Sequence, residues 1–271
     1  MARIVFSHAN SFGASTYGVL LDSLRQRGFA IEALERFGHD PQYPVTNNWP
    51  HLVQQLIDFA EARVQQLGGP AFLVGHSFGG FISLMAAARR PDLARAVVLI
   101  DSPILGGWRA TTLGVIKRTQ LVGAVSPGSV SRLRRISWPD QAAALAHFAG
   151  KKAFARWDPR VLQDYIAHGT HDEGDGVERK RVLSFDRAVE TAIYNTVPDN
   201  LDHLFKRHPI KCPVAFIGGS HSAEMKQVGM AMTQRITRGR IMMLDGSHLF
   251  PMEKPIATAA ALEAALLNLC V

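Results

Sequence analysis

The sequence predicts an α/β fold in which helices cover a mostly parallel β-sheet of about six strands, and three observations lead to this prediction. Short apolar segments typical of buried strands alternate with longer segments typical of helices. One strand-like segment runs directly into the pattern G-x-S-x-G at residues 75–79, and a helix-like segment follows. The alternation stops between residues 103 and 209 and then resumes, which predicts a long insertion between two strands.

Six segments are expected to be strands, because each is short, apolar and separated from the next by a helix-like segment or a turn. These strands are Arg3–Ser7, Ala30–Glu35, Ala71–Gly75, Ala96–Ile100, Pro213–Gly218 and Arg240–Leu244. The helices expected between them are Ser15–Arg27, Trp49–Leu67, Phe78–Arg90 and Ala223–Arg238. A last helix, Pro255–Leu269, begins with proline at an allowed first-turn position and is expected to pack on the sheet.

Residues 105–207 are expected to form a helical cap inserted into a core made of residues 1–104 and 208–271. This segment has no convincing strand pattern, and Gly169–Gly176 is typical of a polar loop. Its helix-like stretches are Trp138–Phe148, Pro159–His168 and Asp186–Thr196. Ligands of an open α/β sheet bind beyond the carboxyl ends of the strands, so an insertion that leaves such an end is expected to cover the site as a lid.

The composition is typical of a globular protein rather than a membrane or nucleic-acid-binding protein. The chain has 271 residues, 47% of them hydrophobic, and no apolar run reaches the roughly 18 residues that span a bilayer. The net charge of +7 comes from dispersed basic residues, so no nucleic-acid partner is expected. The N-terminus lacks the apolar region of a secretory signal, and only Cys212 and Cys270 are present, so a cytoplasmic protein with reduced thiols is expected.

The segment around Ser77 has the order strand, tight turn, helix. Residues Ala71–Val74 are apolar, glycines stand at positions 75 and 79, and the following helix-like segment ends at Pro91. A serine on such a turn needs small neighbours, because strand and helix approach closely there. The helix N-terminus behind the serine supplies amide donors where an oxyanion would form. This arrangement predicts a nucleophilic serine at a strand–helix elbow.

In three places the chain resembles the α/β-hydrolase superfamily. Gly75–Gly80 looks like its nucleophile elbow, Ser7–Asn10 is similar to its oxyanion-hole loop, and Asp245–His248 looks like its catalytic histidine loop. The insertion sits where that family carries its cap. The family usually has two further strands before the first strand of this chain, so the resemblance implies a shortened sheet of about six strands.

His248 is the expected general base. A serine hydroxyl is a weak nucleophile at neutral pH, and an adjacent histidine can take its proton and return it to the leaving group. His248 lies on the loop after the last expected core strand, in the chain order serine, acid, histidine. His76 is expected to point away from the Ser77 hydroxyl, and His8 is expected to shape its loop or border the substrate pocket.

The acid that would orient His248 has two candidates. Many hydrolases of this kind place it after the strand that follows the cap, where the expected position falls on Ser222 and Glu224 comes two residues later. Others, including haloalkane dehalogenases, place it one strand earlier, where Asp101 stands 24 residues after Ser77. Asp101 is the preferred acid, Glu224 is the alternative acid, and a site without a conventional acid is the third alternative.

The oxyanion hole requires two amide donors aimed at the developing charge. One is expected to be the backbone N–H of Phe78, the residue after the nucleophile. The second is expected from the loop after His8. This loop looks about two residues longer than the shortest family version, so Asn10 and Phe12 compete for the role.

Together these residues predict a serine hydrolase that cleaves an ester or similarly activated acyl substrate through an acyl-enzyme on Ser77. The alternatives are a carbon–carbon bond hydrolase or lyase on the same fold, and a non-catalytic ligand receptor. Trp108 and Trp138 of the cap are expected to line the pocket for a small-molecule substrate. No metal and no cofactor are expected, and the protein is expected to be a monomer or homodimer.

Overall fold

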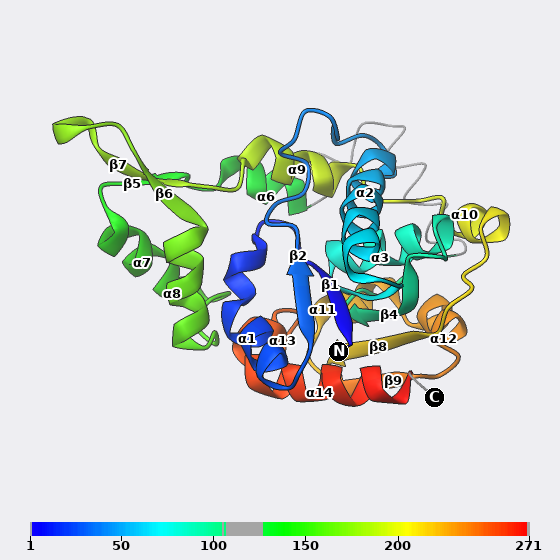
Figure 1. Cartoon of the computed structure of the whole chain (residues 1–271). Helices are drawn as coiled ribbons and strands as arrows, with labels where there is room; N and C mark the ends of the chain where they lie inside the picture. The colour runs from blue at the N-terminus through cyan, green and yellow to red at the C-terminus, as the bar shows by residue number, and fades with distance from the viewer. Residues whose placement is uncertain (1, 105, 107–126, 270–271) are drawn as a thin grey trace.

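The computed structural model describes residues 2–104, 106 and 127–269, and its central feature is a six-stranded sheet (Figure 1). The strand order is β2-β1-β3-β4-β8-β9, and every neighbouring pair is parallel. The strands are β1 (Arg3–Ser7), β2 (Ala30–Ala33), β3 (Ala71–His76), β4 (Ala94–Ile100), β8 (Val214–Gly219) and β9 (Ile241–Leu244). The predicted parallel sheet of about six strands is confirmed, and its boundaries differ from the prediction by at most two residues.

Both faces of this sheet are buried, because alternate side chains of the strands enter two different hydrophobic layers. Along β4, Ala96, Val98 and Ile100 belong to one layer, whereas Val97 and Leu99 belong to the other. Helices α1 (Gly18–Gln26) and α14 (Pro255–Asn268) cover the first face, and the 3₁₀ helix η1 (Ala14–Tyr17) comes directly before α1. Helices α2 (Pro50–Leu67) and α3 (Phe78–Arg89) cover the second face. Burial on both faces explains why the strands are continuously apolar.

One stretch expected to be a single helix is two helices in the structure. Residues 223–238 form α11 (Ala223–Val228) and α12 (Ala231–Thr237). Gly229 between them has a φ of 77°, a conformation that glycine adopts readily and that ends the first helix. The prediction of one continuous helix was wrong because it overlooked this glycine.

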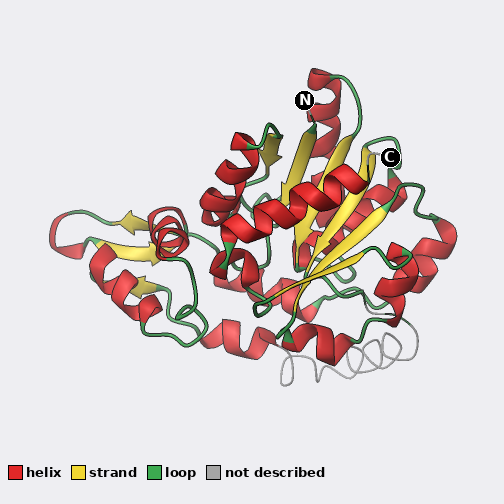
Figure 2. Ribbon diagram, turned by 90° about the horizontal axis from the view of Figure 1, so that it is seen from below, coloured by secondary structure: helices red, strands yellow, loops and turns green. Residues whose placement is uncertain are grey.

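Between β4 and β8 the described chain forms a group of elements with its own small sheet, which Figure 2 shows set apart from the six-stranded sheet. The described helices of this insertion are α6 (Pro127–Leu133), α7 (Gln141–Ala149), α8 (Pro159–His168), η2 (Gly176–Glu178), α9 (Arg187–Asn195) and α10 (Leu201–Arg207). Its strands are β5 (Ser137–Trp138), β6 (Thr170–Glu173) and β7 (Lys180–Leu183). They pair antiparallel in the order β5-β7-β6.

The insertion is mostly helical, as expected, but the expectation that it has no strand was wrong. The stretch expected to be a polar loop contains β6, which pairs with β7 across a turn at Gly174. Opposite charges face each other directly across this pair, Asp172 with Arg181 and Glu173 with Lys180. Such cross-strand pairs stabilise exposed strands, but they remove the apolar alternation by which a strand is recognised in a sequence.

The insertion approaches the core at the carboxyl ends of the strands of the six-stranded sheet. Figure 1 shows α6 and α9 beyond these ends, whereas α7, α8 and the small sheet lie to one side. Helix α9 contacts the core at Trp49, whose indole Nε1 donates to the carbonyl of Ile193 and to the Thr196 hydroxyl. The insertion thus meets the edge of the sheet at which ligands of open α/β folds bind.

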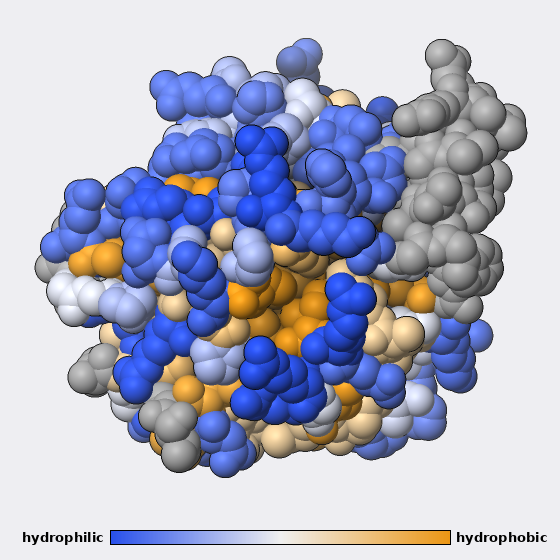
Figure 3. Space-filling model, turned by 90° about the vertical axis from the view of Figure 1, so that its right-hand side faces the viewer, coloured by the Kyte–Doolittle hydropathy of each residue, from blue (hydrophilic) through white to orange (hydrophobic). Residues whose placement is uncertain are grey.

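The face of the molecule in Figure 3 carries an apolar patch bordered by hydrophilic side chains. At the amino end of β8, the described residues also form a hollow of about 320 Å³. The lining residues include the apolar Ile210, Val214 and Ile236 and the cationic Lys211, Arg235, Arg238 and Arg240. This end of β8 is opposite to the carboxyl ends of the strands, so the hollow is separate from the expected site.

None of the helices within residues 2–104 and 127–269 combines the length and the apolar character that crossing a bilayer requires.

Candidate active site

Ser77 lies on a tight turn between β3 and α3. Its φ of 53° and ψ of −119° are a strained combination for a residue with a side chain. Two hydrogen bonds hold this conformation. The Ser77 N–H donates to the carbonyl of Ile100 at 2.9 Å, and the Ser102 hydroxyl donates to the carbonyl of Ser77 at 2.9 Å. The turn thus fixes the serine at the amino end of α3, beyond the carboxyl end of β3.

Two glycines allow strand, turn and helix to approach this closely. A Cβ atom on Gly75 would lie 2.2 Å from the backbone of Gly79, and a Cβ atom on Gly79 would lie 2.1 Å from the carbonyl oxygen of Ser7. Backbone atoms at such distances cannot give way, so a side chain at either position would push the elements apart. The approach of Gly79 to Ser7 also brings the loop after β1 beside the elbow.

The ring of His248 lies between Ser77 and Asp101, on the loop that joins β9 to α13 (Phe250–Glu253). Its Nε2 is 2.9 Å from the Oγ of Ser77, and its Nδ1 is 2.6 Å from Oδ2 of Asp101. A carboxylate only accepts hydrogen bonds, so Nδ1 carries the hydrogen and Nε2 can accept from the serine hydroxyl. The structure therefore brings Ser77, His248 and Asp101 together in one hydrogen-bonded chain.

Asp101 follows the last residue of β4, with a φ of 42°, and its side chain is fully buried. Oδ1 accepts the N–H of Gly219 at 2.7 Å, and Oδ2 accepts the Ser222 hydroxyl at 2.6 Å in addition to His248. A buried carboxylate requires such partners, because burial without them carries a large desolvation penalty. Ser222, the position at which many hydrolases carry the acid, thus supports an acid that comes from another strand.

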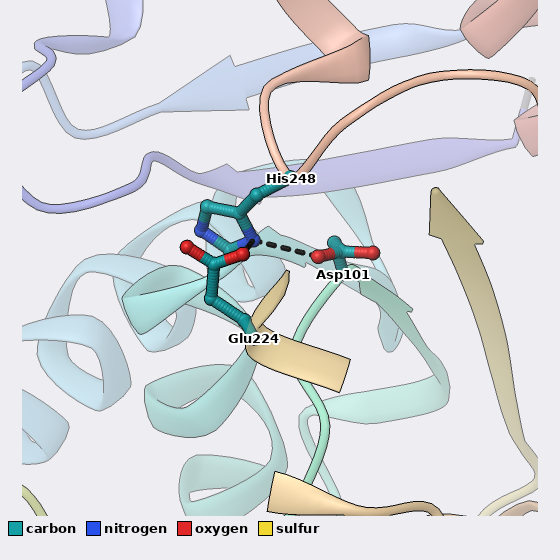
Figure 4. Close-up of side chains that lie close together, drawn as sticks. All are labelled: Asp101, Glu224 and His248. Atoms are coloured by element: carbon teal, nitrogen blue, oxygen red, sulfur yellow. Dashed lines mark hydrogen bonds and ion pairs between the residues drawn. The ribbon is translucent and has the colours of Figure 1, made fainter. Parts of the chain in front are cut away.

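Glu224 lies near His248 without a hydrogen bond to it (Figure 4). Its Oε2 is 3.8 Å from Nδ1 of His248, and its side chain is 45% exposed. The closest polar contact between Glu224 and Ser222 is 3.3 Å, longer than the Ser222–Asp101 hydrogen bond. Glu224 is therefore a second carboxylate beside the imidazole, but Asp101 occupies the hydrogen-bonding position.

The two carboxylates alter the proton affinity of His248. Burial disfavours the charged imidazolium, but the hydrogen bond to Asp101 and the charges of Glu224 and Asp101 outweigh burial. As a result, the pKa of His248 lies above the ordinary value for histidine. Such a ring is a stronger base than a solvated one, and it is uncharged only above this raised pKa.

Two backbone amides, one in the turn after Ser77 and one in the loop after β1, have no acceptor among the described residues. The N–H of Phe78 is the first of α3, and among the described residues nothing accepts it or the N–H of Asn10. By contrast, the N–H of Phe12 donates to the carbonyl of Ala9 at 3.3 Å in a turn. Of the two competing positions in this loop, Asn10 therefore has the free amide.

Comparison with known proteins gives the family of this chain. A model described as the alpha/beta hydrolase family matches residues 4–261. The chain belongs to this family. The matched region contains every residue of the hydrogen-bonded chain described above, so the site lies within the part that the family shares.

Solved structures of α/β-hydrolases share this fold. The hydrolase of E-2-(acetamidomethylene)succinate superposes with a TM-score of 0.69 at 22% identity, over 98% of this chain and 91% of that one. A peroxisomal alpha-beta-hydrolase from Saccharomyces cerevisiae superposes with a TM-score of 0.72 at 14% identity, over 100% of this chain and 77% of that one. At these identities the likeness establishes the fold and not the substrate.

Curated relatives carry several names. A protein of Mycobacterium phage D29, provisionally named a non-heme haloperoxidase, is 26% identical over 276 residues, which cover 99% of this chain and 88% of the relative. The monoglyceride lipase of Rattus norvegicus is 27% identical over 130 residues. That match covers 46% of this chain and 43% of the lipase, so it concerns less than half of either protein.

His76, the residue before the nucleophile in this α/β-hydrolase, links two loops of the site. Its Nε2 lies 2.9 Å from the carbonyl of His248, which can only accept, so Nε2 carries the hydrogen. Its Nδ1 then accepts the Tyr17 hydroxyl at 2.8 Å, and the Tyr17 oxygen accepts the N–H of Ala9 at 3.0 Å. Burial lowers the pKa of His76 well below its ordinary value, so the ring stays neutral in this role.

His8 shapes its loop, as expected, but it does not border an open pocket. Its ring is fully buried, and burial lowers its pKa to about 4. Nε2 accepts the N–H of Phe37 at 3.2 Å, and Nδ1 lies 2.8 Å from the carbonyl of Ala9. These bonds tie the loop after β1 to the segment after β2.

Of the two tryptophans expected in the substrate pocket, the structure describes only Trp138. Trp108 lies outside the described residues. Trp138 packs within the insertion against His147 and Phe148, at centroid distances of 5.5 and 5.2 Å, and only 2% of it is exposed. Strand β5, which carries Trp138, lies on the far side of the insertion from the core strands in Figure 1. The structure therefore does not bring Trp138 to Ser77, and the expectation that it lines the pocket was wrong.

Sequence reasoning missed Tyr17 and Glu190, which both contact the loop after β1, where an oxyanion-hole donor was expected. Tyr17 bonds the N–H of Ala9, and Glu190 of α9 bonds the side chains of Asn10 and Ser11. No local pattern marks either residue, because each belongs to an ordinary helical turn. Only the approach of distant segments gives them a place at the site.

Proposed function

We propose that this α/β-hydrolase is a serine hydrolase that cleaves an ester or a similarly activated acyl substrate through an acyl-enzyme on Ser77. The observation that carries the proposal is the hydrogen-bonded chain from Ser77 Oγ through His248 to Asp101, with distances of 2.9 and 2.6 Å. These distances suit a nucleophile, its base and the group that orients the base.

In the proposed reaction, His248 Nε2 takes the proton of Ser77 as Oγ attacks the acyl carbon. The tetrahedral oxyanion is bound by the N–H groups of Phe78 and Asn10, and the positive end of α3 adds to its stabilisation. The imidazolium then returns the proton to the leaving oxygen, and the acyl group stays on Ser77. A water molecule, activated by the same Nε2, releases the acid and restores the serine.

Asp101 is proposed as the acid of this triad and Glu224 as an auxiliary charge. Asp101 holds the Nδ1–H tautomer that leaves Nε2 free to accept a proton, and it stabilises the imidazolium without taking the proton itself. Its bonds to Gly219 and Ser222 prevent the carboxylate from turning away. Glu224 adds negative charge at 3.8 Å from the ring.

Two alternative functions are less well supported. A non-catalytic receptor was an alternative because Ser222 stands where an acid is usual, and the Asp101–His248 contact removes that reason. Carbon–carbon bond hydrolysis and lyase chemistry use the same serine and histidine, and they differ in whether an acyl group accumulates on Ser77.

The insertion of residues 105–207 is proposed to act as the cap over this site.

The proposal is tested by reaction with a fluorophosphonate probe and by a panel of acyl esters of increasing chain length. Wild type is expected to be labelled on Ser77 and to hydrolyse at least one ester, whereas Ser77→Ala loses labelling and several orders of magnitude in turnover. The melting temperature of Ser77→Ala should stay near that of wild type. Turnover by Ser77→Ala close to wild type would disprove the serine mechanism.

A further inference from the structure

We propose that Glu190, on helix α9 of the insertion, is a positioning residue that sets the backbone amide of Asn10 for oxyanion binding. This inference rests on the serine-hydrolase function proposed above and adds a residue outside the reacting groups. Only 5% of the Glu190 side chain is exposed. A carboxylate this deeply buried needs partners for both of its oxygens, and those partners explain its role.

Glu190 holds the loop after β1 by two hydrogen bonds. The Ser11 hydroxyl donates to Oε1 of Glu190 at 2.6 Å, and Nδ2 of Asn10 donates to the backbone carbonyl of Glu190 at 3.0 Å. Oδ1 of Asn10 also accepts the N–H of Ser11 at 3.0 Å. Both side chains are therefore tied to α9, and these ties come directly after the peptide that presents the free Asn10 N–H.

Ser11 adopts a conformation that needs this support. Its φ is 78°, in the left-handed region that residues with a side chain rarely occupy. Such a residue persists only where its surroundings hold it. The short hydrogen bond to Glu190 is a contact that comes from outside the loop, so the insertion supplies part of the restraint.

The second oxygen of Glu190 binds Arg134, which comes from the residues after α6. Nη1 of Arg134 donates to Oε2 of Glu190 at 2.7 Å, and Nη2 donates to the Tyr165 hydroxyl at 3.0 Å. The Arg134 side chain is 18% exposed, so the pair is an internal network rather than a surface ion pair. The network joins α9 and α8 and keeps the Glu190 carboxylate directed at Ser11.

Phe12, the next residue of the loop, also packs against residues of the insertion. The rings around it are those of Phe154, Trp157 and Tyr165, with centroid distances of 6.4, 5.4 and 5.6 Å. Asn10, Ser11 and Phe12 therefore all have partners from the insertion. The oxyanion loop is correctly placed only while α8 and α9 are docked on the core.

The consequence for catalysis follows from how an oxyanion hole works. An amide stabilises the transition state only when its N–H points at the developing charge, and a displacement of about 1 Å costs on the order of 10²-fold in rate. Loss of the Glu190 carboxylate should thus lower kcat more than it raises KM. It should also lower the affinity for inhibitors that form tetrahedral adducts more than it lowers the affinity for substrate.

The test compares the full-length wild type with Glu190→Ala, Ser11→Ala, the double variant and Glu173→Gln as a control. Glu173 is an exposed carboxylate of the same insertion and lies outside the Glu190 network. The readouts are kcat and KM for an ester and the affinity of a trifluoromethyl ketone. Ser77 Oγ adds to the carbonyl carbon of this ketone, its proton passes to His248, and the resulting oxyanion occupies the hole.

For Glu190→Ala we expect kcat to fall by about 10–100-fold, KM to change by less than about threefold, and ketone affinity to fall in parallel with kcat. Ser11→Ala should cause part of this loss. The double variant should be no worse than Glu190→Ala, because both changes remove the same contact. Glu173→Gln should match wild type in every readout.

A second variant separates positioning from folding, since Glu190→Ala leaves the half-buried Arg134 without its carboxylate partner. Glu190→Gln combined with Arg134→Met keeps an acceptor for Ser11 and removes the unpaired charge, so it should restore kcat to within about threefold of wild type. Loss of kcat in this variant, or unchanged kcat and ketone affinity in Glu190→Ala, would overturn the positioning role. If wild type itself neither hydrolyses esters nor binds the ketone, the proposed function fails instead.

Discussion

The Oε2 atom of Glu224 lies 3.8 Å from Nδ1 of His248, beyond hydrogen-bond reach but close enough for its charge to act on the ring. Asp101 occupies the hydrogen-bonding position at 2.6 Å. The two carboxylates therefore act on one imidazole in different ways. Asp101 fixes the orientation and tautomer of His248, and both carboxylates raise its pKa.

Glu224→Gln should move the acid limb of the pH profile to lower pH. His248 must be neutral to accept the serine proton, so kcat/KM rises as the pH rises through the pKa of His248. The Glu224 carboxylate raises that pKa, and its removal lowers it, so activity persists further into acid. Because Glu224 is 45% exposed, solvent screening keeps this shift small. The measurement is kcat/KM against pH for both proteins, and an unmoved midpoint would contradict the expected effect.

Asp101→Asn should reduce turnover by roughly 10²–10⁴-fold at neutral pH, because asparagine cannot hold the Nδ1–H tautomer or stabilise the imidazolium. Glu224→Gln is the matched control and should cost far less, since no hydrogen bond joins Glu224 to the ring. Steady-state kinetics of the two variants decide between the carboxylates. A larger loss in Glu224→Gln than in Asp101→Asn would transfer the role of acid to Glu224.

Gly79→Ala should destabilise the fold at the elbow. The added Cβ would lie 2.1 Å from the carbonyl oxygen of Ser7, and two backbone segments would have to move apart. We expect the free energy of unfolding to fall by about 3 kcal/mol or more, as for severe overpacking. Gly150→Ala is the control, because its Cβ would meet nothing closer than 3.4 Å. Chemical denaturation measures both, and equal stabilities would refute the steric argument.

Trp138→Ala should lower stability without changing which acyl chains are preferred. The Trp138 ring is 2% exposed and packs against His147 and Phe148 inside the insertion, so its loss leaves a cavity that costs about 3 kcal/mol. Trp157→Ala makes a useful contrast, because Trp157 contacts Phe12 of the oxyanion loop and should affect kcat as well. Melting temperature and the ester panel are the readouts. An altered chain-length profile in Trp138→Ala would place this ring at the substrate after all.

The sequence by itself determined the six parallel strands and the positions of Ser77 and His248. These predictions rest on signals within a few residues, namely apolar runs, glycines at 75 and 79, and chain order. Steric limits explain why such signals are sufficient. A Cβ at Gly75 or Gly79 would overlap backbone atoms, so the local pattern admits one kind of turn.

Only the tertiary structure decided which partners these residues have. Asp101 is 147 residues from His248 and Glu224 is 24, yet the distant residue reaches Nδ1 at 2.6 Å and the nearer one stops at 3.8 Å. The sequence likewise contained no sign of the hydrogen bond that occupies the Phe12 N–H, the burial of Trp138 or the contact of Glu190 with Ser11. Each depends on differences of about an ångström between segments far apart in the chain. Local propensity and hydrophobic periodicity carry no information at that scale, because packing of the whole fold sets these distances.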